Sequence, residues 1–198
     1  MMSGRNKKNE AVFLDRDGTI NEEVGHMDSL DKLRILAPSF EAVRLINQSG
    51  MKAVVVTNQS GVAKGLFDEE LVRQANARIQ SLLRERGAHI DRFYYCPHHP
   101  TEGQGRYLQV CDCRKPGAGM LIRAARQMNI DLGRSYMVGD MVKDMEAARR
   151  AGAKAVLVGT GHGGKALSDE QTLADVPPDY IARDLLDAVG WIMKDRVP

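Results

Sequence analysis

Two aspartates follow a short apolar run near the start of the chain, in the segment FLDRDGTI. One residue, Arg16, separates Asp15 from Asp17, and Gly18 follows directly, so the chain can turn sharply there. An isolated Asp-x-Asp pair is usually a solvated turn. This pair is accompanied farther along the chain by a hydroxyl group, a lysine and a third aspartate, at Thr57, Lys115 and Asp140. Such groups together could bind and transfer a phosphoryl group.

The carboxylates of Asp15 and Asp140 would repel each other at one site unless a cation lay between them. A hard divalent cation fits, because Mg²⁺ is usually held by one or two carboxylates together with substrate phosphate. Thr57 would supply a hydroxyl donor to the phosphate, and Lys115 a fixed positive charge. These residues therefore predict a magnesium-dependent phosphate site.

Short apolar runs alternate with amphipathic segments, and this order predicts the elements that position the site. Strands are expected at 11–14, 51–58, 92–96, 136–138, 154–158 and near 180–181. Helices are expected at 39–50 with Ser39 as N-cap, from Asp68 to about 86, at 117–128, at 143–152 and from about 184. The alternation is typical of an α/β, Rossmann-like parallel sheet with helices on both faces, whose ligands bind beyond the carboxyl ends of the strands.

Length and composition predict a single domain over residues 1–198, with 43% hydrophobic residues to form its core. The formal net charge is only +2, which gives no electrostatic basis for binding nucleic acid or an anionic membrane. The N-terminal segment MMSGRNKKNE lacks the apolar run of a secretory signal. We therefore expect a cytoplasmic protein without nucleic-acid or membrane partners and, since no pattern indicates an oligomer, a monomer.

All three cysteines lie in one segment at about 96–115, within CPHHP and CDC. An odd number of cysteines in a reducing compartment argues against a disulfide framework. One interpretation is three free thiols in a surface loop. The other is a structural zinc site with four nitrogen and sulfur ligands, namely Cys96, His98, Cys111 and Cys113, with His99 as the alternative histidine. We expect zinc to fix this loop and to hold Arg114 and Lys115 at the phosphate site.

The segments DRDGT, VVVTNQSG, RKP and GDMVKD resemble the four ordered motifs of the haloacid dehalogenase (HAD) superfamily and span residues 15–144. The resemblance implies that Asp15 is a nucleophile that forms an aspartyl-phosphate and that Asp17 is the general acid and base. It also implies that Mg²⁺ is held by the side chains of Asp15 and Asp140 and the backbone carbonyl of Asp17. Thr57 and Lys115 would position the phosphoryl oxygens.

An aspartate has a reference pKa of ~3.9, so the site would have to raise the pKa of Asp17 for acid catalysis. Cap domains of this superfamily are inserted between the motifs. The intervals from Asp15 to Thr57 and from Thr57 to Lys115 are filled by predicted strands, helices and the cysteine loop. We therefore expect the HAD fold without a separate cap domain.

The cysteine loop makes the resemblance more specific. CPHHP followed by CDCRKP resembles the D-glycero-D-manno-heptose 1,7-bisphosphate 7-phosphatases. The related histidinol-phosphate phosphatases share the Cys-x-His and Cys-x-Cys pairs but have a shorter loop between them, whereas residues 99–110 separate the pairs here. The resemblance implies hydrolysis of the 7-phosphate of a heptose bisphosphate, in the biosynthesis of nucleotide-activated heptose for lipopolysaccharide or another glycan.

Substrate contacts are expected from residues beside the motifs, namely Glu23, His26, Asn58, Gln59, Ser60 and Arg114. Arg114 would bind the distal part of the substrate, including its second phosphate. Met141 stands where the resemblance leads us to expect a lysine, and EEVGHM at 22–27 differs from the Asp-His-Gly-Tyr often found there. The alternative functions are a phosphatase for histidinol phosphate or another small ester, and a non-catalytic, zinc-stabilised binding module.

Overall fold

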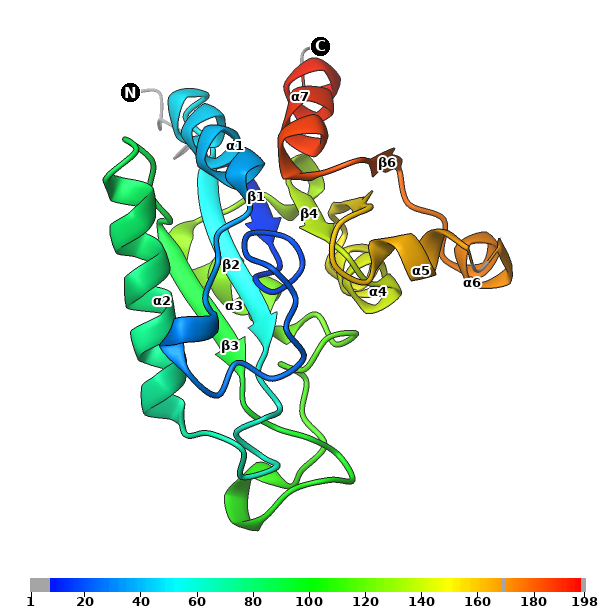
Figure 1. The fold of residues 1–198 in the computed structure, drawn as a ribbon. Coiled ribbons are helices and arrows are strands. Elements are labelled where there is room, and N and C mark those ends of the chain that lie inside the picture. Colours follow the sequence, from blue (N-terminus) through cyan, green and yellow to red (C-terminus); the bar gives the residue numbers. More distant parts are fainter. Residues whose placement is uncertain (1–7, 169, 197–198) are drawn as a thin grey trace, which may run out of the picture.

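Six parallel strands form one sheet in the computed structural model, which describes residues 8–168 and 170–196 (Figure 1). The strand order is β3-β2-β1-β4-β5-β6. The strands are β1 (Ala11–Leu14), β2 (Lys52–Asn58), β3 (Arg92–Cys96), β4 (Tyr136–Gly139), β5 (Lys154–Val158) and β6 (Tyr180–Ala182). All six predicted strands are therefore confirmed. Residues 1–7, on which the prediction of no N-terminal signal partly rests, lie outside the described residues.

Strand β1 lies inside the sheet because every one of its side chains is apolar and buried. Leu14, its last residue, is paired with Val55 of β2 on one side and with Val138 of β4 on the other. Such continuous apolar runs are typical of parallel strands that are covered on both faces. The carboxyl ends of β1, β2 and β4 therefore meet, and the residues that follow these three strands are neighbours.

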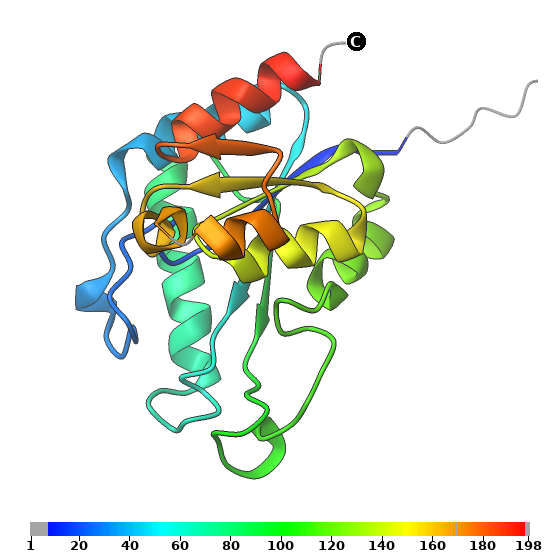
Figure 2. The same ribbon diagram turned by 90° about the vertical axis from the view of Figure 1, so that its right-hand side faces the viewer.

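Helices cover both faces of the sheet, as the alternation predicted (Figures 1 and 2). The helices α1 (Ala37–Gln48), α2 (Glu69–Arg84) and α7 (Leu185–Asp195) pack on the face that presents Val12 and Leu14. The helices α3 (Gly119–Met128) and α4 (Val142–Ala151) pack on the face that presents Phe13. Shorter helices are η1 (Leu30–Lys32), η2 (Gly105–Tyr107), η3 (Leu132–Arg134), α5 (Gly163–Leu167) and α6 (Glu170–Asp175).

The predicted start of the first helix is wrong. Helix α1 begins two residues earlier than expected, with Leu36 at the N-cap and Pro38 in its first turn, where proline is favoured. Ser39 is buried within the helix, and its hydroxyl donates to the carbonyl oxygen of Thr19 at 3.3 Å. The prediction for α2 is confirmed, because the Asp68 carboxylate accepts a hydrogen bond from the backbone N–H of Leu71.

The loops that follow the carboxyl ends of the strands form one end of the molecule. The longest of them follows β3 and extends beyond the sheet (Figure 2). A glycine-rich segment, GTGHGG, follows β5, and helix α5 begins within it at Gly163. Within the described residues, no helix combines the length and the apolar character needed to span a bilayer.

Candidate active site

Three buried aspartates gather at the carboxyl ends of the central strands. Asp15 directly follows β1, Asp140 directly follows β4, and Asp144 lies in the first turn of α4. Their nearest carboxylate oxygens all lie within 4.8 Å of one another. Burial and the neighbouring charge of Asp15 raise the pKa of Asp140 to about 7. A divalent cation would remove this repulsion, so the donor set fits Mg²⁺.

Asp140 is fixed by a turn that leaves no space for additional side chains. The backbone N–H of His162 donates to Oδ2 of Asp140 at 2.8 Å. Gly18 has a φ of 79°, and a β-carbon there would overlap the Asp140 carboxylate. A β-carbon at Gly161 would overlap the same oxygen. The two glycines therefore allow the backbone of the turns after β1 and β5 to approach the Asp140 carboxylate closely.

Lys115 is the counter-charge of this cluster. Its side chain is fully buried, and its Nζ lies 2.8 Å from Oδ1 of Asp15 and 2.7 Å from Oδ1 of Asp144. Burial alone would lower the pKa of Lys115, but the charges of Asp144 and Asp15 outweigh it and raise this pKa. Lys115 therefore remains a cation beside Asp15.

Asp144 was not among the predicted site residues. Its carboxylate accepts a hydrogen bond from the backbone N–H of Met141 at 3.0 Å. An acidic residue at the third helical position is a common cap and carries no catalytic signal. The structure adds a second role, because the same carboxylate pairs with Lys115, and burial raises the pKa of Asp144 while Lys115 opposes this. Asp144 thus holds the lysine against Asp15.

The Asp17 carboxylate accepts hydrogen bonds from three side chains. Arg16 donates through Nε at 3.1 Å and Nη2 at 3.0 Å, Asn21 at 2.8 Å and Gln59 at 2.7 Å. Burial acts to raise the pKa of Asp17, but the charge of Arg16 and these hydrogen bonds outweigh it and lower this pKa. The shift is opposite to the one that acid catalysis was expected to require, so the free site holds Asp17 as a carboxylate.

The side chains at the end of β2 differ in how fully they are already hydrogen-bonded. The Gln59 amide donates to the Thr57 hydroxyl at 3.0 Å, which leaves the hydroxyl hydrogen of Thr57 available for an acceptor such as phosphate. The Asn58 amide donates to the carbonyl of Lys115 and accepts from its N–H, both at 3.0 Å. Asn58 therefore positions Lys115, and the substrate contact expected of it stays a prediction.

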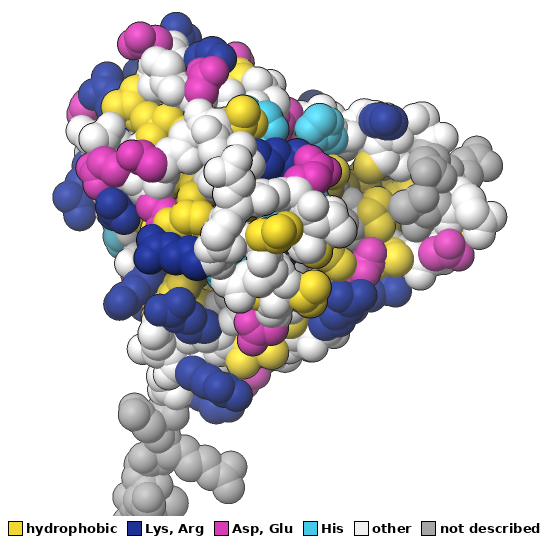
Figure 3. All heavy atoms as spheres, turned by 90° about the horizontal axis from the view of Figure 1, so that it is seen from below, with side chains coloured by type: hydrophobic (Ala, Val, Ile, Leu, Met, Phe, Trp, Pro, Cys, Tyr) yellow, Lys and Arg dark blue, Asp and Glu magenta, His cyan; other side chains and the backbone are white. Residues whose placement is uncertain are grey.

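A cavity of about 250 Å³ opens at this end of the sheet. Ten predicted site residues line it: Asp15, Asp17, Glu23, His26, Thr57, Asn58, Gln59, Ser60, Arg114 and Asp140. Lys115 is buried and is not part of the lining. Phe67, Met141, Lys143 and His162 also line the cavity and were not among the predicted contacts. Figure 3 shows the face at this end of the molecule, where histidine and basic side chains lie close to acidic ones.

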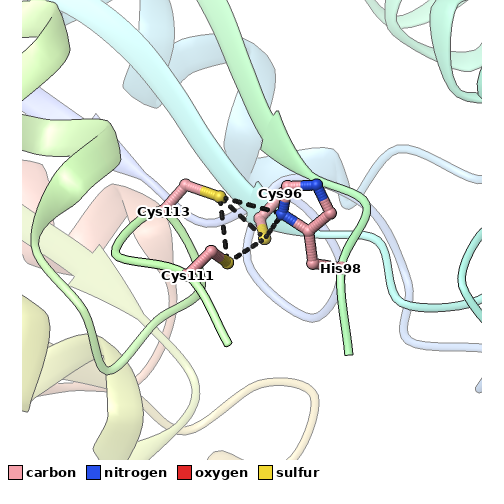
Figure 4. Close-up of side chains that lie close together, drawn as sticks. All are labelled: Cys96, His98, Cys111 and Cys113. Atoms are coloured by element: carbon pink, nitrogen blue, oxygen red, sulfur yellow. Dashed lines mark hydrogen bonds between the residues drawn. The ribbon is translucent and has the colours of Figure 1, made fainter. Parts of the chain in front are cut away.

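The cysteine cluster joins Cys96, the last residue of β3, to three residues of the loop that follows (Figure 4). The sulfur of Cys113 is 3.1 Å from that of Cys96 and 3.2 Å from that of Cys111, and 3.4 Å from Nδ1 of His98. All four ligand atoms lie within 4.8 Å of one another. His98 is thus the histidine of the cluster. His99 faces elsewhere, because its Nδ1 accepts a hydrogen bond from the N–H of Glu102 at 2.9 Å.

Hydrogen bonding shifts the acidity of the cysteines in opposite directions. Its hydrogen bonds, above all the one shared with Cys96, lower the pKa of Cys113 to about 5, whereas the same bond and burial raise the pKa of Cys96. Arg114 is connected to this cluster, since its Nη1 donates to the carbonyl of His98 at 3.2 Å.

Comparison with known proteins yields consistent matches. Residues 112–188 match the HAD-hydrolase-like family model. The chain is 47% identical over 153 residues to the D-glycero-beta-D-manno-heptose-1,7-bisphosphate 7-phosphatase of Pasteurella multocida, a match that covers 77% of this chain and 83% of that protein. It is 41% identical over 190 residues to the protein of the same name from Escherichia coli K12, with 95% and 96% covered.

A solved structure is similar along nearly the whole length. It is a D,D-heptose 1,7-bisphosphate phosphatase from B. bronchiseptica in complex with magnesium and phosphate. The two chains are 32% identical, with a TM-score of 0.81, and the match covers 94% of this chain and 99% of the other. The presence of magnesium in that structure agrees with the carboxylate cluster found here.

Proposed function

The chain belongs to the heptose-1,7-bisphosphate 7-phosphatases of the HAD-like hydrolases, and from this we infer that it removes the 7-phosphate of D-glycero-D-manno-heptose 1,7-bisphosphate. The observation that carries this inference is the 41% identity to the Escherichia coli protein across 95% of the chain. The related proteins are named for the β-anomer, and we propose the same preference here. The product would serve the biosynthesis of nucleotide-activated heptose.

We propose that Asp15 attacks the phosphorus of the 7-phosphate and forms an aspartyl-phosphate, while the sugar hydroxyl leaves. The fixed position of Asp15 after a central, buried strand supports this role. Lys115 would stabilise the charge of the phosphoryl oxygens, and Thr57 would donate a hydrogen bond to one of them. Asp144 would position Lys115. The Asp15 and Asp140 carboxylates and the Asp17 carbonyl would hold Mg²⁺, which neutralises phosphate charge.

Asp17 would protonate the leaving oxygen and then accept a proton from the water that hydrolyses the aspartyl-phosphate. Its lowered pKa in the free site suits the second step. The first step needs a protonated carboxyl group, and an arriving phosphate would favour it, because a nearby negative charge raises the pKa of an acid. We therefore propose that substrate binding itself prepares Asp17 for acid catalysis.

The proposed function is tested by phosphate release in the presence of Mg²⁺. We expect the β-anomer of the heptose bisphosphate to be hydrolysed with a kcat/KM at least about 100-fold above that of histidinol phosphate, a difference of about 2.7 kcal/mol in transition-state stabilisation. The same measurement with the α-anomer gives the anomer preference. A higher kcat/KM for histidinol phosphate would contradict the proposed substrate. If none of the three compounds were hydrolysed, the proposed phosphatase activity would be contradicted.

We propose that the cysteine cluster holds a structural zinc ion. Three sulfurs and one imidazole nitrogen are the ligands of closed tetrahedral zinc sites. Helix α2 supports the same loop, since the Glu69 carboxylate accepts hydrogen bonds from the hydroxyls of Tyr95 and Tyr107, both at 2.6 Å. Zinc and Glu69 would together fix the loop that carries Arg114 and Lys115. We also propose that the chain acts as one domain, without a cap and as a monomer.

The two adjacent histidines provide a matched test of the zinc proposal. Protein purified without chelator should contain about one zinc per chain. His98→Gln should reduce the zinc content and lower the midpoint of thermal unfolding, because it removes a ligand. His99→Gln should leave both unchanged. Zinc content is measured by elemental mass spectrometry. The proposal is contradicted if the wild type contains no zinc, or if the two variants have the same zinc content.

A further inference from the structure

Arg16 is a buried arginine between the two aspartates, with 1% of its surface exposed. Arginine is almost never fully buried unless it is paired. Among the acids that the structure describes, Asp17 is the one that pairs with Arg16, through Nε at 3.1 Å and Nη2 at 3.0 Å. The remaining nitrogen, Nη1, donates to Oδ1 of Asn76 at 3.3 Å. Each of the three guanidinium nitrogens therefore has a partner.

Asn76 is a buried polar residue on a face of α2 that is otherwise apolar. The other buried residues of this helix are Val72, Ala75, Ile79 and Leu83. Asparagine is a weaker helix former than alanine or leucine, and its amide is costly to bury without a hydrogen bond. Apolar residues in place of a buried ion pair are often as stable or more stable. Stability alone therefore does not explain why an asparagine stands at this position.

The contact with α2 fixes the orientation of the arginine. Arg16 and Asp17 are neighbours in the chain, so the arginine side chain must fold back beside Asp17 to bond both of its carboxylate oxygens. The guanidinium is planar, and its two parallel hydrogen bonds determine the plane of the carboxylate. The bond to Asn76 holds the guanidinium from its other side. The orientation of Asp17 thus depends on a helix that is distant in sequence.

The Asp17 carboxylate accepts four hydrogen bonds, about as many as a carboxylate has acceptor sites. One of these bonds must break before Asp17 can carry the proton of a general acid. Gln59 is the donor that can leave, because it lines the cavity and its amide also donates to the Thr57 hydroxyl. Arg16 and Asn21 are not part of the cavity lining. The proton would therefore lie on Oδ2, the oxygen that Gln59 bonds, while Arg16 keeps its position.

We propose that Arg16, anchored by Asn76, is a positioning residue that orients Asp17 as it protonates the leaving sugar oxygen. In this step the bond from phosphorus to the sugar oxygen breaks and a bond from phosphorus to Asp15 forms. The proton moves from Oδ2 of Asp17 to the sugar oxygen, which leaves as a hydroxyl group. Neither Arg16 nor Asn76 lines the cavity, so both act through Asp17. This proposal rests on the proposed function.

Two substitutions disturb the orientation and keep the positive charge. Arg16→Lys retains a cation without the planar fork, and Asn76→Leu retains Arg16 without its anchor. Each should lower kcat/KM for heptose 1,7-bisphosphate at least about tenfold, as part of the roughly 10²–10⁴-fold that a general acid contributes. Acetyl phosphate is the comparison substrate, because acetate leaves without a proton. Its kcat/KM, which excludes the later hydrolysis of the aspartyl-phosphate, should change less than about twofold.

A second measurement uses the heptose substrate alone, in the Asp17→Asn background. If Asn76 acts through Asp17, adding Asn76→Leu should change the residual kcat/KM of Asp17→Asn by less than about twofold. A purely structural role of Asn76 would instead lower this residual value by the same factor as in the wild type, and that result would overturn the proposal.

Asn47→Leu is the matched control. Asn47 is an asparagine in the last turn of α1, and its amide bonds to the backbone of His89. The control should hydrolyse both substrates as the wild type does. The proposal is overturned by equal losses for the two substrates, by no loss for the bisphosphate in either variant, or by loss of the folded state in both. A wild-type protein that does not hydrolyse the bisphosphate contradicts the proposed function itself, and this is recognised before any variant is made.

Discussion

Phosphatase activity is expected to fall by at least about 10⁴-fold when Asp15 is replaced by asparagine, with the fold retained. The amide has nearly the shape of the carboxylate but cannot attack phosphorus. The fold should tolerate the change, because Asp15 is one of three buried acids that lie together, and only Asp15 and Asp144 pair with the single lysine, Lys115. Removal of its charge lowers their repulsion, so the midpoint of thermal unfolding in magnesium-free buffer should stay the same or rise.

Asp28→Asn is the matched control for this substitution, since Asp28 is an exposed aspartate in the same N-terminal segment and pairs with Lys32. It should retain full activity. Mass spectrometry must show that the asparagine at position 15 has not deamidated, because deamidation restores the aspartate. Activity within about tenfold of the wild type, in protein shown to be intact, would rule out the nucleophilic role of Asp15.

Replacement of Lys115 by methionine should affect both activity and stability. Its Nζ lies within 2.8 Å of both Asp15 and Asp144, so the substitution leaves two buried carboxylates without a counter-charge. Loss of one partner from a buried ion pair costs about 3–5 kcal/mol in the free energy of unfolding. Activity should fall by at least about 10³-fold, because the cation beside the reacting phosphate is lost. Phosphate release and urea denaturation in magnesium-free buffer measure the two effects.

The destabilisation by Lys115→Met should increase with pH. The pKa of Asp144 is already raised by burial, and Lys115 opposes that shift. Without the lysine, this pKa rises further above the unfolded value of ~3.9. A group with a raised pKa in the folded state loses stabilisation as pH rises from its unfolded pKa towards its folded one. The variant should therefore be closest to the wild type near pH 4 and least stable above pH 7.

The double variant Lys115→Met/Asp144→Asn separates the two effects. It removes a carboxylate together with the lysine, so most of the lost stability should return, whereas the activity should remain low. Equal unfolding free energies for Lys115→Met and the wild type at pH 8 would mean that the lysine does not compensate the buried carboxylates.

The sequence was enough to predict which residues at strand ends would lie together. It did not reveal residues whose roles depend on how helices pack on the sheet. Asp15, Thr57 and Asp140 come directly after or at the ends of apolar runs, and parallel strands bring such positions together. Asp144 lies within a helix, where its sequence context indicates only a cap. Its burial against Lys115 arises from the docking of α4 on the sheet, which no local pattern encodes.

The start of α1 differs from the prediction for a local reason. Ser39 resembled an N-cap, but Pro38 already fits the first helical turn, so α1 begins before the serine. Asn58 lines the cavity, and its expected contact with substrate stays a prediction, but its bond to Lys115 was not predicted. The Asn58 side-chain amide donates one hydrogen bond to the Lys115 backbone and accepts another from it. A partner so distant in sequence could not be predicted. The selection of His98 over His99 likewise depends on the path of the loop.

Because β1 lies inside the sheet, mutations that affect the chemical steps and mutations that affect substrate preference fall in different parts of the chain. The side chains assigned to the chemical steps are anchored beside β1, β2 and β4, so a mutation there disturbs the core as well as the reaction. The residues that line the rest of the cavity belong to segments that connect these strands to the outer helices. Those segments can vary without repacking the sheet. Selection for a new sugar phosphate, in nature or in a randomised library, would therefore find its beneficial substitutions in the segments at 22–27, 60–67 and 162–168. Gln59 and Gly161 are excluded, because Gln59 donates to Asp17 and a side chain at Gly161 would overlap Asp140.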